Sequence, residues 1–119
     1  MKRTLRLSPS CSEEIESSLL KELMLGYYNL EDQMFDQAMM NFKVVIKFDS
    51  QCADAYWGLM LAKCQIASEE SLFTQAQSYK HIVQLPEFEN ALKFAQGNQR
   101  KQYEGLIAPI RKLIAKEDN

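Results

Sequence analysis

The sequence predicts an all-α fold, and three observations support this. The chain has 119 residues but only four glycines and three prolines, too few for a turn-rich protein built from strands. Leu, Ala, Glu, Lys, Gln and Met dominate after position 10, and these residue types favour helix. Apolar residues also recur every three or four positions, the period of an amphipathic helix. At this length we expect one domain over 10–119, preceded by a flexible arm over 1–9.

The first two helices are predicted from a cap and from their apolar spacing. Ser10 and Glu13 have the spacing of a capping box, so a helix should begin near Cys11. Its apolar positions continue to Tyr28, and the polar segment that follows favours a turn. A second helix is expected over 34–48, with an apolar stripe formed by Phe35, Ala38, Met39, Phe42, Val45 and Ile46.

The middle of the chain contains one clear helix and one ambiguous segment. Asp49 and Ser50 should end the second helix and cap a third, over 51–67. Residues 68–85 begin with a polar interruption and fit either a short helix or an ordered loop.

Two further helices complete the prediction. Pro86 suits the first position of a helix, Gly97 should end that helix, and Asn98 should cap the last one. The last helix, over 98–116, has a regular apolar stripe of Tyr103, Leu106, Ile107, Ile110, Leu113 and Ile114. Pro109 lies inside this helix and should bend it, because proline removes a backbone hydrogen bond.

A sequence repeat groups these helices into two hairpins. Residues 35–38 and 88–91 both read aromatic, acid, amide, alanine, and both open a helix. Their offset is 88 minus 35, or 53 positions, whereas a helical-hairpin repeat of a common type has about 34 residues. We therefore expect hairpin one over 10–50 and hairpin two over 51–97. An insertion over 67–85 lengthens the second hairpin, and 98–116 serves as a capping helix that covers its open side.

The residues of these hairpins resemble the tetratricopeptide-repeat family. Leu25 and Gly26, then Ala38 twelve residues on, then Phe42, follow the pattern of that family, and 53–59 is similar to the opening of its first helix. The resemblance covers about 19–96 and is degenerate, because Ser50, Met60 and Ala95 stand where the family usually has proline, glycine and an aromatic residue. The segments 55–63, 85–88 and 91–92 also look like a bacterial subgroup with an irregular pair of repeats.

The resemblance implies an all-α superhelix with a groove lined by the first helix of each hairpin. In this register the groove residues are Leu20, Leu23, Tyr27, Leu30, Asp54, Trp57, Leu61 and Cys64. Aromatic residues are favoured binding anchors, although Trp57 and Tyr27 fit a place in the core equally well. The basic and amide residues that clamp a terminal carboxylate in some family members are missing from these places, so an apolar helix or peptide is the expected partner.

The expected function is therefore non-catalytic protein binding in the cytoplasm, as an adaptor or scaffold. A self-associating homodimer that uses the same apolar surface is the alternative. Nucleic-acid binding through basic residues such as Arg111 and Lys112 is a weaker one, because the net charge of −2 gives no attractive field.

The sequence provides little for catalysis or for metal binding. Its three cysteines match no disulfide or zinc pattern, and we expect free thiols in a reducing compartment. The one histidine, His81, is more simply a surface or packed residue than a general base. No glycine-rich phosphate loop and no long apolar run occurs, so we expect no cofactor, no metal and no membrane partner.

Overall fold

The structure is a computed structural model that describes residues 5–9 and 11–117. Within these residues every regular element is a helix and none is a strand, which confirms the all-α prediction. The elements are α1 (Glu13–Glu31), α2 (Phe35–Phe48), α3 (Ala53–Lys63), α4 (Ser71–Thr74), the 3₁₀ helix η1 (Ala76–Gln84), α5 (Pro86–Phe94) and α6 (Gly97–Glu117).

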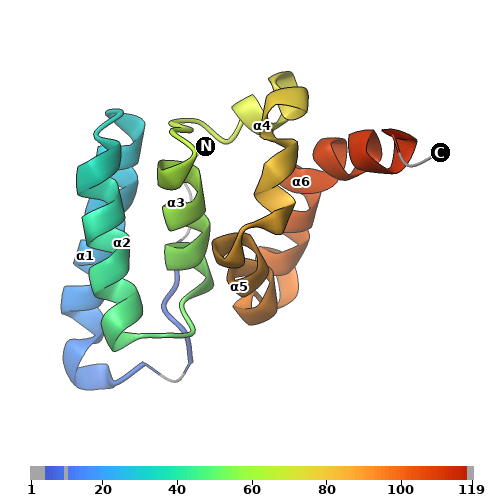
Figure 1. Ribbon diagram of the computed structural model, residues 1–119. Coiled ribbons are helices and arrows are strands. Elements are labelled where there is room, and N and C mark those ends of the chain that lie inside the picture. The colour runs from blue at the N-terminus through green and yellow to red at the C-terminus, as the bar shows by residue number, and fades with distance from the viewer. Residues whose placement is uncertain (1–4, 10, 118–119) are drawn as a thin grey trace.

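The helices form an elongated stack in chain order. α1 packs on α2, α2 on α3, and α3 on α5 (Figure 1). The chain reverses direction between α1 and α2 and again between α2 and α3, since short connections make neighbouring helices antiparallel. The stack extends over 51 × 28 × 26 Å, with α1 and α2 at one end. We call these two helices the first hairpin.

Phe42 joins three helices at the centre of this stack. Its ring is fully buried between Gly26 on α1 and Gly58 on α3. A Cβ atom added at Gly26 would lie 2.6 Å from the ring, and one added at Gly58 would lie 2.3 Å from it. The absence of a side chain at Gly26 and the small, buried Ala38 therefore allow α1 and α2 to approach closely.

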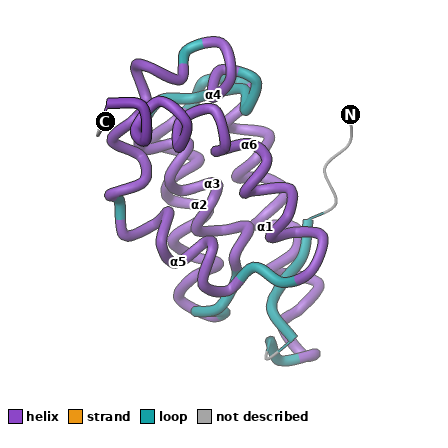
Figure 2. Tube along the Cα trace, turned by 90° about the vertical axis from the view of Figure 1, so that its right-hand side faces the viewer, coloured by secondary structure: helices purple, strands orange, loops and turns teal. Residues whose placement is uncertain are grey.

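Segment 67–85, whose conformation the sequence left open, contains α4 and η1. Tyr79 has non-helical backbone angles and interrupts η1 (φ −114°, ψ 20°). Both elements pack against α6 and stand at the same end of the molecule as the second half of that helix (Figure 2). Leu72 and Ile82 are fully buried there, so the segment contributes to the core.

The last two helices confirm two proline predictions and correct one cap. Pro86 is the first residue of α5. α6 contains Pro109 and changes direction along its length (Figure 1), as expected when a backbone hydrogen bond is missing. Gly97 has φ +56° and is already the first residue of α6, so Asn98 lies inside the helix rather than at its cap. The buried residues of α6 are Tyr103, Ile107 and Ile110.

Two other predicted helix starts differ from the structure. α1 begins at Glu13 with Ser12 as its N-cap, and the predicted cap Ser10 lies outside the described residues. The N-cap of α3 is Cys52 rather than Asp49 or Ser50. Asp49 does not cap α3 because its carboxylate accepts hydrogen bonds from a distant segment, described below.

Candidate functional site

The predicted groove residues lie mainly in the core. Six of the eight are buried, namely Leu23, Tyr27, Leu30, Asp54, Trp57 and Leu61, and the other two, Leu20 and Cys64, are half-buried. α1 and α3 contact each other and bring these residues together. The structure differs in their exposure, since Trp57 and Tyr27 are core residues.

The protein's own segments cover Trp57. The indole stacks on the ring of Tyr103 from α6, with ring centres 4.2 Å apart and planes 10° apart. Its Nε1–H donates to the Glu69 carboxylate at 2.7 Å. The sequence predicts that the last helix covers the second hairpin, but it does not predict this stacking. A helical period shows which residues share a face, and it does not show which neighbour covers that face.

Asp54 is the centre of a buried polar network. It is 1% exposed, and its Oδ2 accepts the backbone N–H of Arg6 at 2.8 Å. Tyr103 donates its hydroxyl to Oδ1 of the same carboxylate, and Tyr27 donates its hydroxyl to the Asp54 backbone carbonyl at 2.6 Å. This network ties α1, α6 and the N-terminal arm to the first turn of α3.

A second buried carboxylate holds the arm. Asp49 is 3% exposed, and it accepts both the backbone N–H of Ser8, at 2.7 Å, and the hydroxyl of that serine. The Cys52 thiol donates to the backbone carbonyl of Arg6 at 3.3 Å. Residues 5–9 thus lie against the core, which differs from the predicted flexible arm. Residues 1–4 of that arm lie outside the described part.

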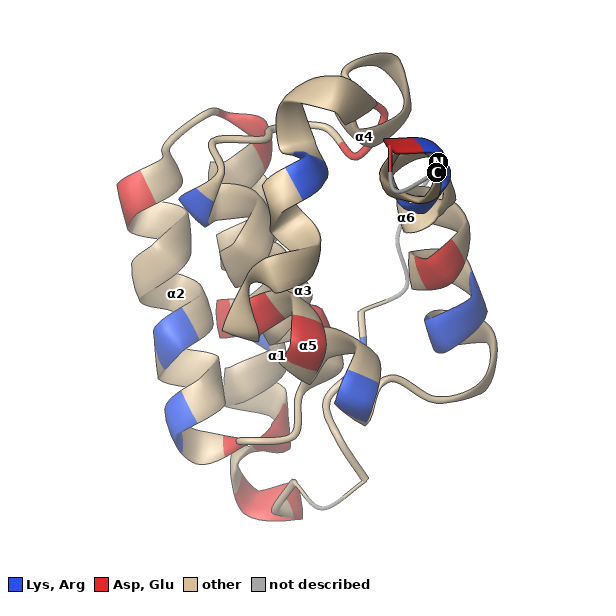
Figure 3. Cartoon of the chain, turned by 45° about the vertical axis from the view of Figure 1, so that its right-hand side comes forward, with Lys and Arg blue, Asp and Glu red and all other residues tan. Residues whose placement is uncertain are grey.

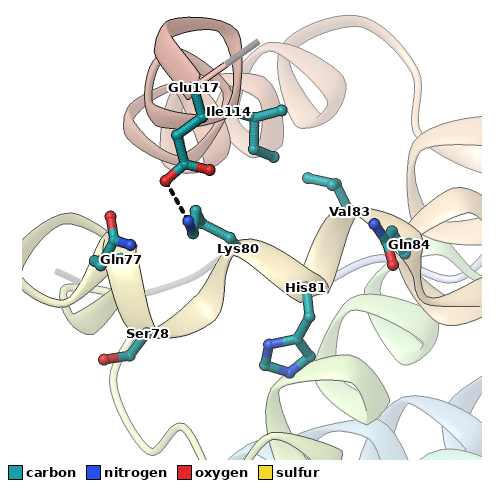
Figure 4. A pocket seen from close by; sticks show the side chains of 8 residues that line it. All are labelled: Gln77, Ser78, Lys80, His81, Val83, Gln84, Ile114 and Glu117. Carbon is teal, nitrogen blue, oxygen red and sulfur yellow. Dashed lines mark hydrogen bonds and ion pairs between the residues drawn. The ribbon is translucent and has the colours of Figure 1, made fainter.

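A pocket of about 500 Å³ lies between η1 and the end of α6 (Figure 4). The residues that line it are Gln77, Ser78, Lys80, His81, Val83, Gln84, Ile114 and Glu117. Lys80 forms an ion pair with Glu117, and His81 points away from that pair. His81 Nε2 lies 3.7 Å from the Cys64 sulfur, but burial raises the pKa of the Cys64 thiol, which favours the neutral form over a reactive thiolate.

The described residues contain neither a cluster of metal ligands nor a membrane-spanning helix. No three His, Cys, Asp or Glu side chains there lie close enough together to hold a metal ion. No described helix is long and apolar enough to cross a membrane. Lys and Arg are interspersed with Asp and Glu (Figure 3), and on α6 Arg100 pairs with Glu104 while Arg111 lies 5.7 Å from the centre of the Phe88 ring. Part of the basic charge is thus used in local contacts.

Exposed apolar side chains gather on the first hairpin. Seven of the eight large ones in the described residues lie between positions 24 and 48, namely Met24, Leu25, Tyr28, Met34, Met40, Val44 and Phe48, and the eighth is Phe73. Met40, Val44 and Phe48 recur every four residues and so form one row on α2. The signal for this row in the sequence is a second apolar stripe on α2, opposite Ala38 and Val45.

A ladder of hydrogen-bonded polar side chains crosses the seam where α1 and α2 meet, beside this row. The Asn29 amide donates to the Asn41 carbonyl oxygen at 2.7 Å, and the Asn41 amide donates to Glu22 at 3.1 Å. Leu25 shares the face of α1 that carries Glu22 and Asn29, by its spacing of three and four residues. We call Leu25, Met40, Val44 and Phe48 the outer face of the first hairpin.

Comparison with known proteins does not assign a family. No protein-family model matches the sequence, and no curated protein or solved structure is significantly similar to it.

Proposed function

We propose that the chain is a non-catalytic protein-binding module of the tetratricopeptide-like type, and that it binds its partner through the outer face of the first hairpin. Among the described residues, seven of the eight exposed large apolar side chains lie in residues 24–48, and this concentration carries the proposal. Water-exposed apolar groups that gather in one place are typical of protein contact surfaces.

The order of packing supports this location. α3 contacts α1, α2 and α5, and most of its residues are buried. The first hairpin, by contrast, ends the stack, so its far side has no neighbouring helix pair within the described chain. In stacked helical repeats an end unit normally carries a polar outer side, whereas Met40 is 62% exposed here.

The chemistry of the outer face suits a partner helix. Four apolar side chains flank the ladder of Glu22, Asn41 and Asn29. An amphipathic helix laid along the seam buries apolar residues spaced by three or four against this row. Polar groups on that helix can bond to the outer side of the ladder.

Self-association through the same face is the second candidate. An isologous dimer would place the outer face of one copy against the outer face of another. Such a dimer uses the same apolar residues on both copies and needs no second apolar surface. Sedimentation of the full chain over the micromolar range separates the two functions. A constant monomer mass supports a distinct partner, and a mass that doubles with concentration supports the homodimer.

A matched pair of variants tests the binding surface. Phe48 on α2 and Phe73 on α4 are 55% and 49% exposed, so Phe48→Glu and Phe73→Glu place the same charge at similarly exposed phenylalanines. Affinity capture from the native host should recover a set of proteins with wild type and with Phe73→Glu, but not with Phe48→Glu. Identical sets from both variants would exclude the outer face as the binding surface.

A further inference from the structure

The contact of the N-terminal arm with α3 has the chemistry of a peptide-binding site. The backbone N–H groups of Arg6 and Ser8, two residues apart, donate to Asp54 and Asp49 respectively. Alternate N–H groups of an extended chain point to the same side. Two acceptors are therefore placed to bind the backbone of an extended segment, whatever its side chains are.

The flanking side chains add selectivity to this contact. Leu5 and Leu7 are half-buried and pack against the core. The Ser8 hydroxyl donates to Asp49 in addition to the backbone bond. The contact thus uses apolar residues two positions apart, followed by a hydroxyl residue.

The two acceptors are unusual because they are buried charges. Asp49 and Asp54 are the buried charged residues among those described, at 3% and 1% exposure. A buried carboxylate without donors is strongly destabilising. Part of the donor set of Asp49 and Asp54 comes from the N-terminal arm, 41 and 48 positions away. A segment that supplies the same donors can therefore replace residues 5–8 without leaving the charges unsatisfied.

We propose that this surface at the start of α3 is a binding site for an extended segment of a partner protein, and that residues 5–8 of the chain occupy it in the free protein. The partner segment carries apolar residues at positions i and i+2 and a serine or threonine at i+3, as Leu5, Leu7 and Ser8 do. The site uses Asp49 and Asp54, which are not part of the outer face, so neither proposal depends on the other.

The test measures binding of a labelled peptide with the sequence of residues 4–9 to the full chain. In wild type the tethered arm competes at an effective concentration of millimolar order. The variant Leu5→Ala/Leu7→Ala weakens the arm and should bind the peptide at least about tenfold more tightly than wild type does. Ser8→Pro, which removes both donors to Asp49, is a second way to weaken the arm and should give the same gain.

Control variants of the protein and of the peptide assign the gain in affinity to this site. Asp49→Ala in the weakened background removes both acceptor oxygens and should abolish the gain, whereas Met40→Glu, nine residues earlier on α2, should leave it unchanged. A peptide with both leucines replaced by alanine should not bind. If both arm variants keep the helical signal in circular dichroism and bind the peptide no more tightly than wild type, the proposal is refuted.

Discussion

Gly58→Ala tests whether close packing around Phe42 holds the stack together. By helix propensity alone, alanine would stabilise α3 by about 1 kcal/mol. In the structure, however, the new Cβ would lie 2.3 Å from the Phe42 ring, far inside van der Waals contact. The ring cannot retreat toward α1, because Gly26 already lies on its other side.

The two effects have opposite signs, and the structure decides between them. Overpacking of a rigid core costs about 3 kcal/mol at the upper end of its usual range. The net result is a loss of about 2 kcal/mol, which lowers the melting temperature by roughly 8 °C for a domain of this size. Urea denaturation followed by circular dichroism measures the loss directly.

Gly105→Ala is the matched control, because nothing lies within 4 Å of a Cβ at that position of α6. It should stabilise the protein by up to about 1 kcal/mol. Phe42→Leu combined with Gly58→Ala should cost less than the sum of the single variants, since the smaller side chain relieves the overlap. Equal stabilisation by Gly58→Ala and Gly105→Ala would refute the packing described for Phe42.

Three further predictions concern buried polar groups. Burial raises the pKa of the Cys52 thiol from 9.0 to about 12. Between these pH values the folded state keeps a proton that the unfolded state loses, so the stabilisation present below pH 9 should decrease by about 1.4 kcal/mol per pH unit as the pH rises. Cys52→Ala should remove this contribution to the pH dependence of the unfolding free energy. Tyr103→Phe removes a hydrogen bond to the buried Asp54 carboxylate and should cost about 1.5–3 kcal/mol in urea denaturation; a loss below the error of the measurement would contradict that bond. Glu69→Ala removes the acceptor of the Trp57 indole and should cost about 1–3 kcal/mol, seen as an earlier unfolding transition in Trp57 fluorescence.

Local periodicity and proline chemistry made much of the fold predictable. The apolar spacing of residues 34–48 reflects the single buried stripe of α2, and Pro86 can occupy a helix only near its start. Both signals act over a few residues, so they are read directly from the sequence.

The contacts that close the groove were not predictable in this way. Asp49 is of a residue type that often caps helices, but its carboxylate accepts a hydrogen bond from Ser8, 41 positions away. Asp54 similarly joins Arg6 and Tyr103 through contacts 48 and 49 positions apart. The sequence cannot say which of two distant donors reaches a carboxylate, because that depends on how complete helices pack.

The Trp57 side chain alone does not decide whether that residue is exposed. Its indole has an apolar body and one N–H donor, so it suits a binding groove and a core equally well. α3 has buried residues on nearly all sides, and a continuous run such as 55–62 is a sign of a central helix. That sign, weighed against the family resemblance, would have favoured the core.

Hydroxyl-radical footprinting of the full chain, alone and with its captured partner, tests the proposed binding surface most directly. The exposures of Met40 and Phe48 predict strong labelling in the free protein and protection in the complex, with Trp57 protected in both. Labelling of Trp57 in the free protein, together with its protection by the partner and no change at Met40 and Phe48, would return the binding site to the groove and contradict the outer face.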